Sequence, residues 1–414
     1  MSLVSALYTG VSGLSTNSLA MTVIGDNLAN VNTTGYKSSS PIFGDVLSSI
    51  LNNGSTTMQI GRGSQLTGSL QSFSQGSFSS SGNALDMAID GAGFFVVNNG
   101  VGNVYTRAGQ FRMNDKGLVQ DPSKHILQGF KITGSTTSQK ITNIDMTGVQ
   151  SSPAPSTNFT LGANLNAAAT AGSTFTSPIT LYNSVGAQTL LNITFTKLAA
   201  GNSWNFVASP SIGTITSGAS GTLSFDSTGT LSAVNGGALK NLTIGLAYAA
   251  TTPPANPQTL TWNLVDPINA ATSNGKLTGY AAPSNNNSFV QDGYTTGTLL
   301  SLSVDDKGII SGLFNNGQSQ KLFQVAMANF LAPSGLTRSG QNTFAESAAS
   351  GQPIIGTAKT GGFGSILGST LELSNVDLSG EFVNMIQTQQ AFQAASKIVT
   401  TTNDMLTTSV QLVR

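Results

Sequence analysis

The two ends of the chain carry the same apolar repeat, and this repeat constrains the fold more than any other feature. Positions at alternating spacings of three and four residues are mostly apolar from Val4 to Leu28, and again from Leu378 to Val413. This spacing forms the a/d seam of a coiled coil. Polar or small residues break the first seam at Ser18 and Gly25, and the second at Gln389, Ser396 and Asn403. Two such helices can bury their seams against each other, against neighbouring subunits, or both. The apolar seam residues are Val4, Leu7, Val11, Leu14, Met21 and Leu28 in the first helix, and Leu378, Phe382, Met385, Phe392, Val399, Leu406, Val410 and Val413 in the second.

Turn-forming residues follow the first helical pattern. Asn30, Asn32 and Gly35 favour a helix stop, so the helix should end near residue 30. Residues 38–80 are then rich in Ser, Gly, Gln and Thr, with isolated apolar residues between Ile42 and Leu51. We expect one short helix at those apolar residues and extended or irregular chain beyond them.

Composition limits the possible partners. The 414 residues contain 17 basic and 17 acidic side chains, and charged residues are only 8% of the chain. A basic face large enough for nucleic acid cannot be assembled from so few charges, whereas a net charge near zero favours association. The absence of cysteine excludes disulfides and thiolate metal sites, and a single histidine, His125, argues against a histidine-rich metal cluster.

No targeting or membrane-spanning segment is expected. The first residues lack a basic region followed by an uninterrupted apolar stretch, so they do not form an ordinary signal peptide. The longest apolar-leaning run, residues 322–332, contains Gln324 and Asn329 and is too short to cross a bilayer. Export would therefore need a route that uses neither feature.

The middle of the chain has strand patterns and a repeated turn. Strand-like runs over 84–97 and 104–119 resume at 297–328, which predicts one discontinuous β domain. Three turns share one formula, an Asn or Asp three residues before a glycine: 114–117, 226–229 and 305–308. This formula is typical of a type I turn closed by a left-handed glycine in a hairpin. Residues 150–285 carry few charges and many Ser, Thr and Asn, and they alternate as half-buried strands do.

The predicted fold is therefore multidomain and mainly β, with a nested layout. The terminal α-helices pair as a coiled-coil-like handle, next to a discontinuous β domain and an inserted antiparallel β-sandwich or barrel. The expected parts are a helical assembly domain (1–37 plus 375–414), extended connecting segments (38–83 plus 330–374), the discontinuous β domain (84–149 plus 286–329) and the inserted outer β domain (150–285).

No catalytic, cofactor-binding or metal site is expected. Gly91-Ala92-Gly93 is followed by a strand rather than by the helix that a dinucleotide-binding turn requires. The turn with Asp305 and Asp306 lacks the spaced ligands and terminal glutamate of a calcium loop. His125 is interpreted as a structural histidine in a surface turn, and glutamate is scarce, with Glu346, Glu372 and Glu381.

Four stretches resemble one known family. Residues 6–37 (ALYTGVSGLSTNSLAMTVIGDNLANVNTTGYK), 84–97 (ALDMAIDGAGFFVV), 105–120 (YTRAGQFRMNDKGLVQ) and 374–406 resemble the bacterial flagellar rod and hook proteins. Together they cover both ends and part of the discontinuous β domain. The inserted span, with GAQTLLNITFTK (186–197) and GTLSFDSTGTLSAV (221–234), together with the overall length, is similar to the hook-type members rather than to the shorter rod proteins.

The resemblance implies a structural subunit rather than an enzyme. It implies a helical homopolymer, a curved hollow tube that transmits motor torque from rod to filament as a flexible universal joint. It also implies an extracellular place in the hook and basal body, reached through the flagellar type III export apparatus without a cleaved signal peptide. The implied partners are the chain itself, the distal rod protein, the hook cap and the hook–filament junction proteins, with no nucleic acid, membrane insertion or cofactor.

The resemblance also assigns roles to residues. The seam residues of the first helix would pack against those of the second within and between subunits, and Asn27, Asn30, Asn32, Gly35 and Tyr36 would shape the helix exit. Two alternatives stay open. One is a straight, distal-rod-type protein of the same family. The other is a secreted glycan-binding β protein, favoured by the Asn- and Thr-rich middle, which makes no use of the terminal seams.

Overall fold

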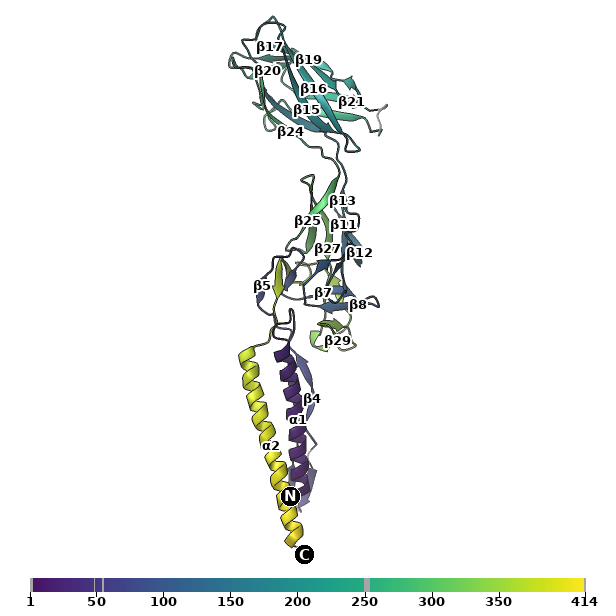
Figure 1. The fold of residues 1–414 in the computed structure, drawn as a ribbon, viewed down its shortest axis with the longest axis vertical. Coiled ribbons are helices and arrows are strands. Elements are labelled where there is room, and N and C mark those ends of the chain that lie inside the picture. The colour runs from purple at the N-terminus through teal and green to yellow at the C-terminus, as the bar shows by residue number, and fades with distance from the viewer. Residues whose placement is uncertain (1–2, 48, 54–55, 249–253, 413–414) are drawn as a thin grey trace. The chain divides into compact units, whose positions relative to one another are not determined.

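The computed structural model describes residues 3–47, 49–53, 56–248 and 254–412. The chain forms two units, each with its own core (Figure 1). Unit 1 comprises Met1–Gly148, Ser301–Leu313 and Ser319–Arg414, and unit 2 comprises Val149–Leu300 and Phe314–Gln318. Unit 1 is therefore discontinuous in sequence.

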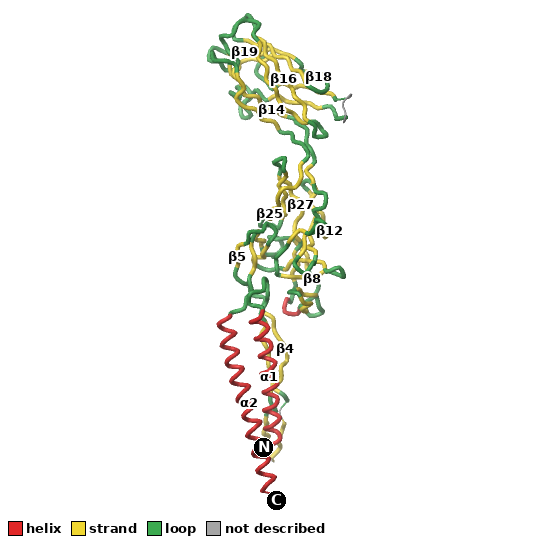
Figure 2. The backbone as a smooth tube through the Cα atoms, viewed as in Figure 1, coloured by secondary structure: helices red, strands yellow, loops and turns green. Residues whose placement is uncertain are grey.

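Two long helices begin and end unit 1. Helix α1 spans Leu3–Ala29 and α2 spans Leu378–Leu412, so both predicted helices are present and α1 ends where Asn30 predicts. The helices lie side by side (Figure 2). They approach closely at Gly10, where an added Cβ would lie 2.8 Å from Val399 Cγ2. Val413 lies outside the described residues. Among the described helices, none combines the length and apolar character needed to span a bilayer.

A β-ribbon follows α1, where one short helix was expected. Strand β1 (Ser39–Asp45) pairs antiparallel with β4 (Ser64–Gln71), and β2 (Ser49–Asn53) pairs with β3 (Thr56–Ile60). The prediction of a helix between residues 42 and 51 was wrong. The ribbon lies against α1, where Ser64 N donates to Ser12 Oγ at 3.3 Å. Pro41 lies within β1, and Pro, Ser and Gly are all unfavourable in a helix interior, so this segment satisfies its backbone groups by strand pairing instead.

The β part of unit 1 joins segments from both halves of the chain. Strand β11 pairs with β27 (Gly129 opposite Val325), and β7 pairs with β28 (Phe95 opposite Met327). Its strands are β5 (Phe78–Ser80), β6 (Met87–Asp90), β7 (Phe94–Asn98), β8 (Asn103–Thr106), β9 (Arg112–Met113), β10 (Val119–Gln120), β11 (Ile126–Thr133), β12 (Thr136–Asn143), β27 (Ser319–Val325), β28 (Met327–Asn329), β29 (Thr337–Gly340), β30 (Thr343–Ala345), β31 (Ile354–Gly356), β32 (Ser365–Gly368) and β33 (Thr370–Glu372). Strands β13 (Gln150–Ser151), β25 (Gly297–Val304) and β26 (Ile309–Phe314) lie at the unit boundaries, and a short 3-10 turn spans Pro333–Gly335.

Aromatic side chains form much of the core of unit 1. Phe94 makes edge contacts with Phe73, Phe330 and Phe344, with ring centroids 5.5–5.9 Å apart. Tyr105 adds a further edge contact with Phe330 at 4.8 Å. Edge-to-face pairs at these distances are favourable beyond the area that they bury.

Unit 2 is a β-sandwich. One sheet has the order β15-β16-β17-β19-β20 and is antiparallel throughout, and the other has the order β18-β21-β22-β14-β23 with β24 also on β14. A single buried cluster contains residues of both sheets, as a sandwich requires. Two pairings differ from the antiparallel prediction, because β14 runs parallel to β22 and β23. The strands are β14 (Asn158–Asn164), β15 (Thr174–Tyr182), β16 (Gln188–Lys197), β17 (Ser203–Pro210), β18 (Thr214–Ser217), β19 (Ser220–Phe225), β20 (Leu231–Val234), β21 (Leu242–Ala247), β22 (Gln258–Trp262), β23 (Leu277–Thr278) and β24 (Asn285–Gln291).

The repeated turn is confirmed. Gly117, Gly229 and Gly308 have φ of 77°, 79° and 71°, and each donates its N–H to the carbonyl oxygen three residues earlier. A further copy begins at Asp121, where the Lys124 N–H donates to Asp121 O at 3.0 Å and Asp121 Oδ1 accepts from His125 N at 2.8 Å. In this copy a lysine occupies the left-handed position, with φ 69° at Lys124. The sequence formula missed it because no glycine marks the turn.

Replacing Lys124 with glycine is expected to raise the free energy of unfolding by about 0.5–1 kcal/mol, because a side chain in the left-handed region is strained and glycine is not. Lys116 is the matched control, since it lies in the 114–117 turn and is not among the positive-φ residues. Lys116→Gly should be slightly destabilising. Urea unfolding of both variants tests this, and equal effects of the two substitutions would contradict it.

Candidate assembly surface and helix exit

The face of α1 that packs inside unit 1 is lined by small residues. Gly10, Thr16, Ala20, Ile24 and Asn27 are its buried residues. Their row lies beside the predicted apolar seam rather than on it. Val4 and Val11 in that seam are 50% and 46% exposed, whereas Leu7, Leu14, Met21 and Leu28 are half-buried. The single chain therefore leaves much of the predicted α1 seam uncovered.

Helix α2 shows the same division. Its buried residues Ala395 and Thr402 face the same side as Met385, Val399 and Leu406, which are half-buried. The other described seam residues are exposed: Leu378 at 43%, Phe382 at 46%, Phe392 at 38% and Val410 at 66%. The seam pattern did not reveal a second group of exposed apolar side chains on α2, Val383, Ile386, Ile398 and Met405.

Asn27 joins three elements where α1 ends. Its side chain is buried, its Oδ1 accepts from Ser39 N at 2.9 Å, and its Nδ2 donates to Ser39 O at 2.7 Å. The same Nδ2 donates to Glu381 Oε1 on α2 at 2.8 Å. One carboxamide thus fixes β1 and the first turn of α2 against the end of α1.

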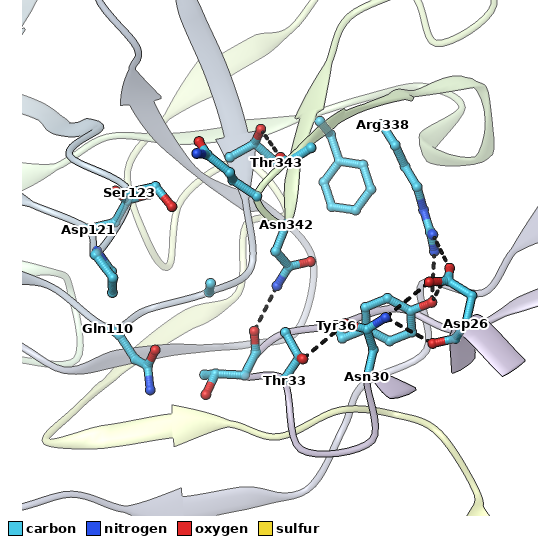
Figure 3. Close-up of a pocket in the computed structure, with 16 residues that line it drawn as sticks. Asp26, Asn30, Thr33, Tyr36, Gln110, Asp121, Ser123, Arg338, Asn342 and Thr343 are labelled. Atoms are coloured by element: carbon cyan, nitrogen blue, oxygen red, sulfur yellow. Dashed lines mark hydrogen bonds and ion pairs between the residues drawn. The ribbon is translucent and has the colours of Figure 1, made fainter. Parts of the chain in front are cut away.

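Tyr36 and Arg338 form a second contact region at the exit (Figure 3). Tyr36 is buried and donates its hydroxyl to Asp26 Oδ2 at 3.0 Å. Burial raises the pKa of the Tyr36 hydroxyl, and Arg338 opposes that rise. Arg338, on β29, lies over the Tyr36 ring at 5.2 Å and forms an ion pair with Asp26 at 3.1 Å. Its Nη2 also donates to Lys37 O and Ser39 Oγ, both at 2.9 Å.

The other exit residues differ in their environment. Asn30 Nδ2 donates to Asp26 O at 2.9 Å, whereas Asn32 is exposed. Gly35 has φ 67° and donates its N–H to Glu372 O at 2.8 Å, and an added Cβ would lie 2.6 Å from the Arg107 backbone. A pocket of about 440 Å³ adjoins the exit, lined by Asp26, Tyr36, Asp121, Arg338 and Asn342 among others.

A buried charge cluster lies directly beyond the exit. Lys37 Nζ is 2.7 Å from Glu372 Oε1, and neither side chain is exposed to solvent. Arg107 Nη1 is 3.4 Å from Glu372 Oε2. Burial lowers the pKa of Lys37 and of Arg107, while Glu372 acts in the opposite direction on both. The cluster holds the exit, β8 and the segment before α2 together.

No pattern in the sequence predicted this cluster. One signal was available, since the chain has only three glutamates and a rare residue type is often placed for a specific contact. Each of the three has a partner: Glu372 contacts Lys37, Glu381 contacts Asn27, and Glu346 lies 3.5 Å from the Tyr105 hydroxyl. Burial, together with Glu346, raises the pKa of Tyr105 to about 12.

The structure shows the surroundings of the glycine-containing turn and the histidine, neither of which was expected to be catalytic. Gly91-Ala92-Gly93 leads into β7, as predicted. The interpretation of His125 as a surface residue was wrong, because its side chain is buried and its Nδ1 lies 2.8 Å from Asp121 Oδ2. The Asp121 carboxylate thus contacts both the backbone N–H and the ring of His125, which ties the ring to the turn. Among the described residues, no three His, Cys, Asp or Glu side chains gather as a metal site would require.

Four family models match the chain. Residues 7–37 match "Flagella basal body rod protein", and 88–151 match "Flagellar hook protein FlgE/F/G D1 domain". Residues 143–294 match "Flagellar basal body protein FlaE D2 domain", and 368–412 match "Flagellar basal body rod FlgEFG protein C-terminal". The matches cover both terminal helices, part of unit 1 and most of unit 2.

Curated relatives match over nearly the full length. The flagellar hook protein FlgE of Treponema pallidum is 30% identical, covering 99% of this chain and 99% of that protein. Its counterpart from Salmonella typhimurium is 31% identical, covering 97% and 98%. A crystal structure of the Helicobacter pylori flagellar hook protein FlgE2 aligns with 70% of this chain and 98% of that chain, at 14% identity and a TM-score of 0.44.

Proposed function

The chain belongs to the family of bacterial flagellar hook proteins, and we propose that it polymerises through its terminal helices into a curved hollow tube. It is a structural subunit of the flagellar hook, and the family implies self-polymerisation within the flagellum. The tube transmits motor torque from rod to filament as a universal joint. The observation that carries this proposal is the apolar surface that α1 and α2 leave uncovered in a single chain.

The uncovered surface supports contacts with neighbouring copies. Val4 and Val11 on α1, and Phe382, Phe392 and Val410 on α2, remain 38–66% exposed. Side chains of this kind along two paired helices are costly in water and are covered when further copies pack against them. In the proposed interface the exposed seam residues contact neighbouring subunits, and the half-buried ones, Leu7, Leu14, Met21, Leu28, Met385, Val399 and Leu406, lie where the intrachain and intersubunit contacts meet.

The side chains on one side of α2 are consistent with a position facing the water-filled channel of the proposed tube. Gln393, Lys397, Thr400 and Asp404 follow one another at helical spacing and are all exposed. A row of charged and polar side chains on a helix is best placed against water. We assign this row to the wall of the channel. The β part of unit 1 and the whole of unit 2 then lie outside the helical wall.

A flexible joint requires outer contacts that rearrange at little cost. Unit 2 has few charges, and Ser, Thr and Asn dominate the span 150–285. Hydrogen bonds from such side chains exchange readily with water, and few fixed ion pairs have to break. This composition supports sliding contacts between outer units, while the helical wall stays packed.

The remaining roles follow from the family. The proposed partners are the distal rod protein, the hook cap, the hook–filament junction proteins and the type III export apparatus. The subunit acts outside the cell and is exported without a cleaved signal peptide. Its role is structural rather than enzymatic, and the helix-exit residues Asn27, Asn30, Asn32, Gly35 and Tyr36 set the direction in which the chain leaves α1.

Val11→Asp and Phe382→Asp are expected to abolish polymerisation and leave the subunit folded. Both side chains are exposed in the single chain, so a carboxylate there is solvated until a neighbouring copy covers it. Circular dichroism checks the fold, and electron microscopy with sedimentation checks assembly.

Thr400→Asp is the matched control, because it places the same charge on the exposed polar row of α2. It should still form tubes. Tubes formed by Val11→Asp and Phe382→Asp at the normal protein concentration would contradict the proposed interface, and images of straight polymers would contradict the curved joint.

A further inference from the structure

A cavity adjoins the buried charge cluster of unit 1. It has a volume of about 300 Å³, and Arg107 forms part of its wall. The rest of the wall combines apolar and amide side chains with a glycine-rich turn: Phe73, Gln75, Gly91, Ala92, Gly93, Phe94, Asn329 and Pro333. The proposed assembly does not use this cavity, which is lined by the β part of the unit and not by the helices.

The charges beside the cavity are unbalanced. Lys37 and Arg107 are two buried cations, and among the described residues Glu372 is the single carboxylate that contacts them. Glu372 Oε1 is taken by Lys37 Nζ at 2.7 Å and by Gly76 N at 2.9 Å. Arg107 receives only the longer contact of 3.4 Å from Oε2. A buried guanidinium with so distant a counter-ion is incompletely compensated, and this is costly.

Arg107 is also short of hydrogen-bond acceptors. Its Nη2 donates to Gly91 O at 2.8 Å, but its Nε has no acceptor among the described residues. A buried N–H without a partner is uncommon in folded proteins and calls for an explanation, such as a bound water or ion. Arg107 is 5% exposed, and it lines the cavity.

The other wall residues restrict what can enter. The guanidinium of Arg107 lies 5.2 Å from the centre of the Phe94 ring, and Phe73 packs edge-on against the same ring. Gln75 uses both ends of its amide, on Ile89 O and Gly91 N. Asn329 Oδ1 accepts from Phe330 N at 2.9 Å, so its Nδ2 is the end left for a ligand. The cavity thus offers donors and apolar surface rather than acceptors.

We propose that this cavity binds a carboxylate carried on a short apolar stem. Arg107 is the main contact, Asn329 is the second donor, and the stem lies against Phe73, Phe94 and Pro333. Charge-assisted hydrogen bonds from a guanidinium to a carboxylate are among the strongest in proteins. The carboxylate comes either from a free small acid or from a side chain of a second copy. Binding does not depend on polymerisation and is measured separately from it.

The test uses the full-length protein as dispersed subunits, with sodium propionate and sodium chloride at equal ionic strength. Propionate at about 100 mM should raise the Tm of unit 1 by roughly 1–3 °C over chloride, because a ligand that binds only the folded state stabilises it. Line broadening of ¹³C-labelled propionate in NMR should report the contact directly. Comparing dispersed subunits with the assembled polymer distinguishes the two sources of the carboxylate. If the propionate response is lost in the polymer, the site holds a carboxylate of a neighbouring copy. If the response persists, the site binds a free acid.

Asn329→Asp is the decisive variant, since it retains the acceptor for Phe330 N and places a carboxylate at the cavity wall. It should abolish the propionate response. Asn287→Asp, on the exposed strand β24 of unit 2, is the matched control and should respond as the unmodified protein does. An equal Tm in propionate and chloride, or a full response in Asn329→Asp, would overturn the proposal.

Discussion

Replacing Glu372 with glutamine is expected to lower the free energy of unfolding of unit 1 by about 3–5 kcal/mol, because two buried cations lose the carboxylate that contacts both of them. Glutamine has nearly the same shape, so packing changes little and the effect is electrostatic. The Gly35 N–H still donates to the residue 372 carbonyl. Urea unfolding followed by the circular dichroism of the helices measures the loss.

Replacing Lys37 tests the same cluster by removing one of its two cations instead of its carboxylate. Lys37→Met should cost less than half as much as Glu372→Gln, because Arg107 and Glu372 remain as a balanced pair. Ser74 O, which accepts from Lys37 Nζ at 2.7 Å, would still accept from Asn375 Nδ2 at 3.1 Å. The double variant should recover more than about 1 kcal/mol relative to the sum of the single effects. Additive losses would refute the charge-imbalance account.

Trp262→Ala is expected to destabilise unit 2 by about 3–5 kcal/mol, because it leaves a large cavity at the centre of the sandwich. The Trp262 ring is fully buried and lies 5.4–6.2 Å from the rings of Phe159, Phe195 and Phe206. The core of unit 1 is a separate cluster. In differential scanning calorimetry the transition of unit 2 should move to lower temperature while that of unit 1 stays in place.

Trp262→Phe is the control for this prediction. The Trp262 Nε1 has no acceptor among the described residues, so replacement by phenylalanine reduces the side-chain volume but breaks no hydrogen bond. Its cost should be well below that of alanine. A common shift of both transitions in Trp262→Ala would contradict the independence of the two cores.

The periodicity of the sequence predicted both helices, but not which side of α1 faces the chain's own second helix. A coiled-coil seam is recognised in a sequence by its large apolar residues, such as Leu7 and Leu14. The close approach to α2 is made instead at Gly10 and Gly13, which have no side chain and carry little weight in a hydrophobicity pattern. The large residues lie at the margin of that contact, where a neighbouring copy is proposed to cover them.

Contacts between distant residues were the least predictable. Lys37 and Glu372 are 335 positions apart, and no local pattern relates them. The turn formula succeeded at Gly117, because an Asx side chain and a left-handed glycine act within five residues. The same formula failed at Lys124, where the Asp121 carboxylate holds the turn without a glycine. Predictability therefore fell with sequence separation and with departure from the preferred residue type.

The Asn27 contact has a consequence for the order of folding. Asn27 and Glu381 are 354 positions apart, so their hydrogen bond closes one of the longest loops that this chain can form. Closing such a loop in an unfolded chain costs conformational entropy that one hydrogen bond cannot offset. Once both β units have folded, they bring the ends of that loop close together. We therefore expect helix pairing to be a late step, so that a chain whose middle is still unfolded presents no completed helix pair for polymerisation.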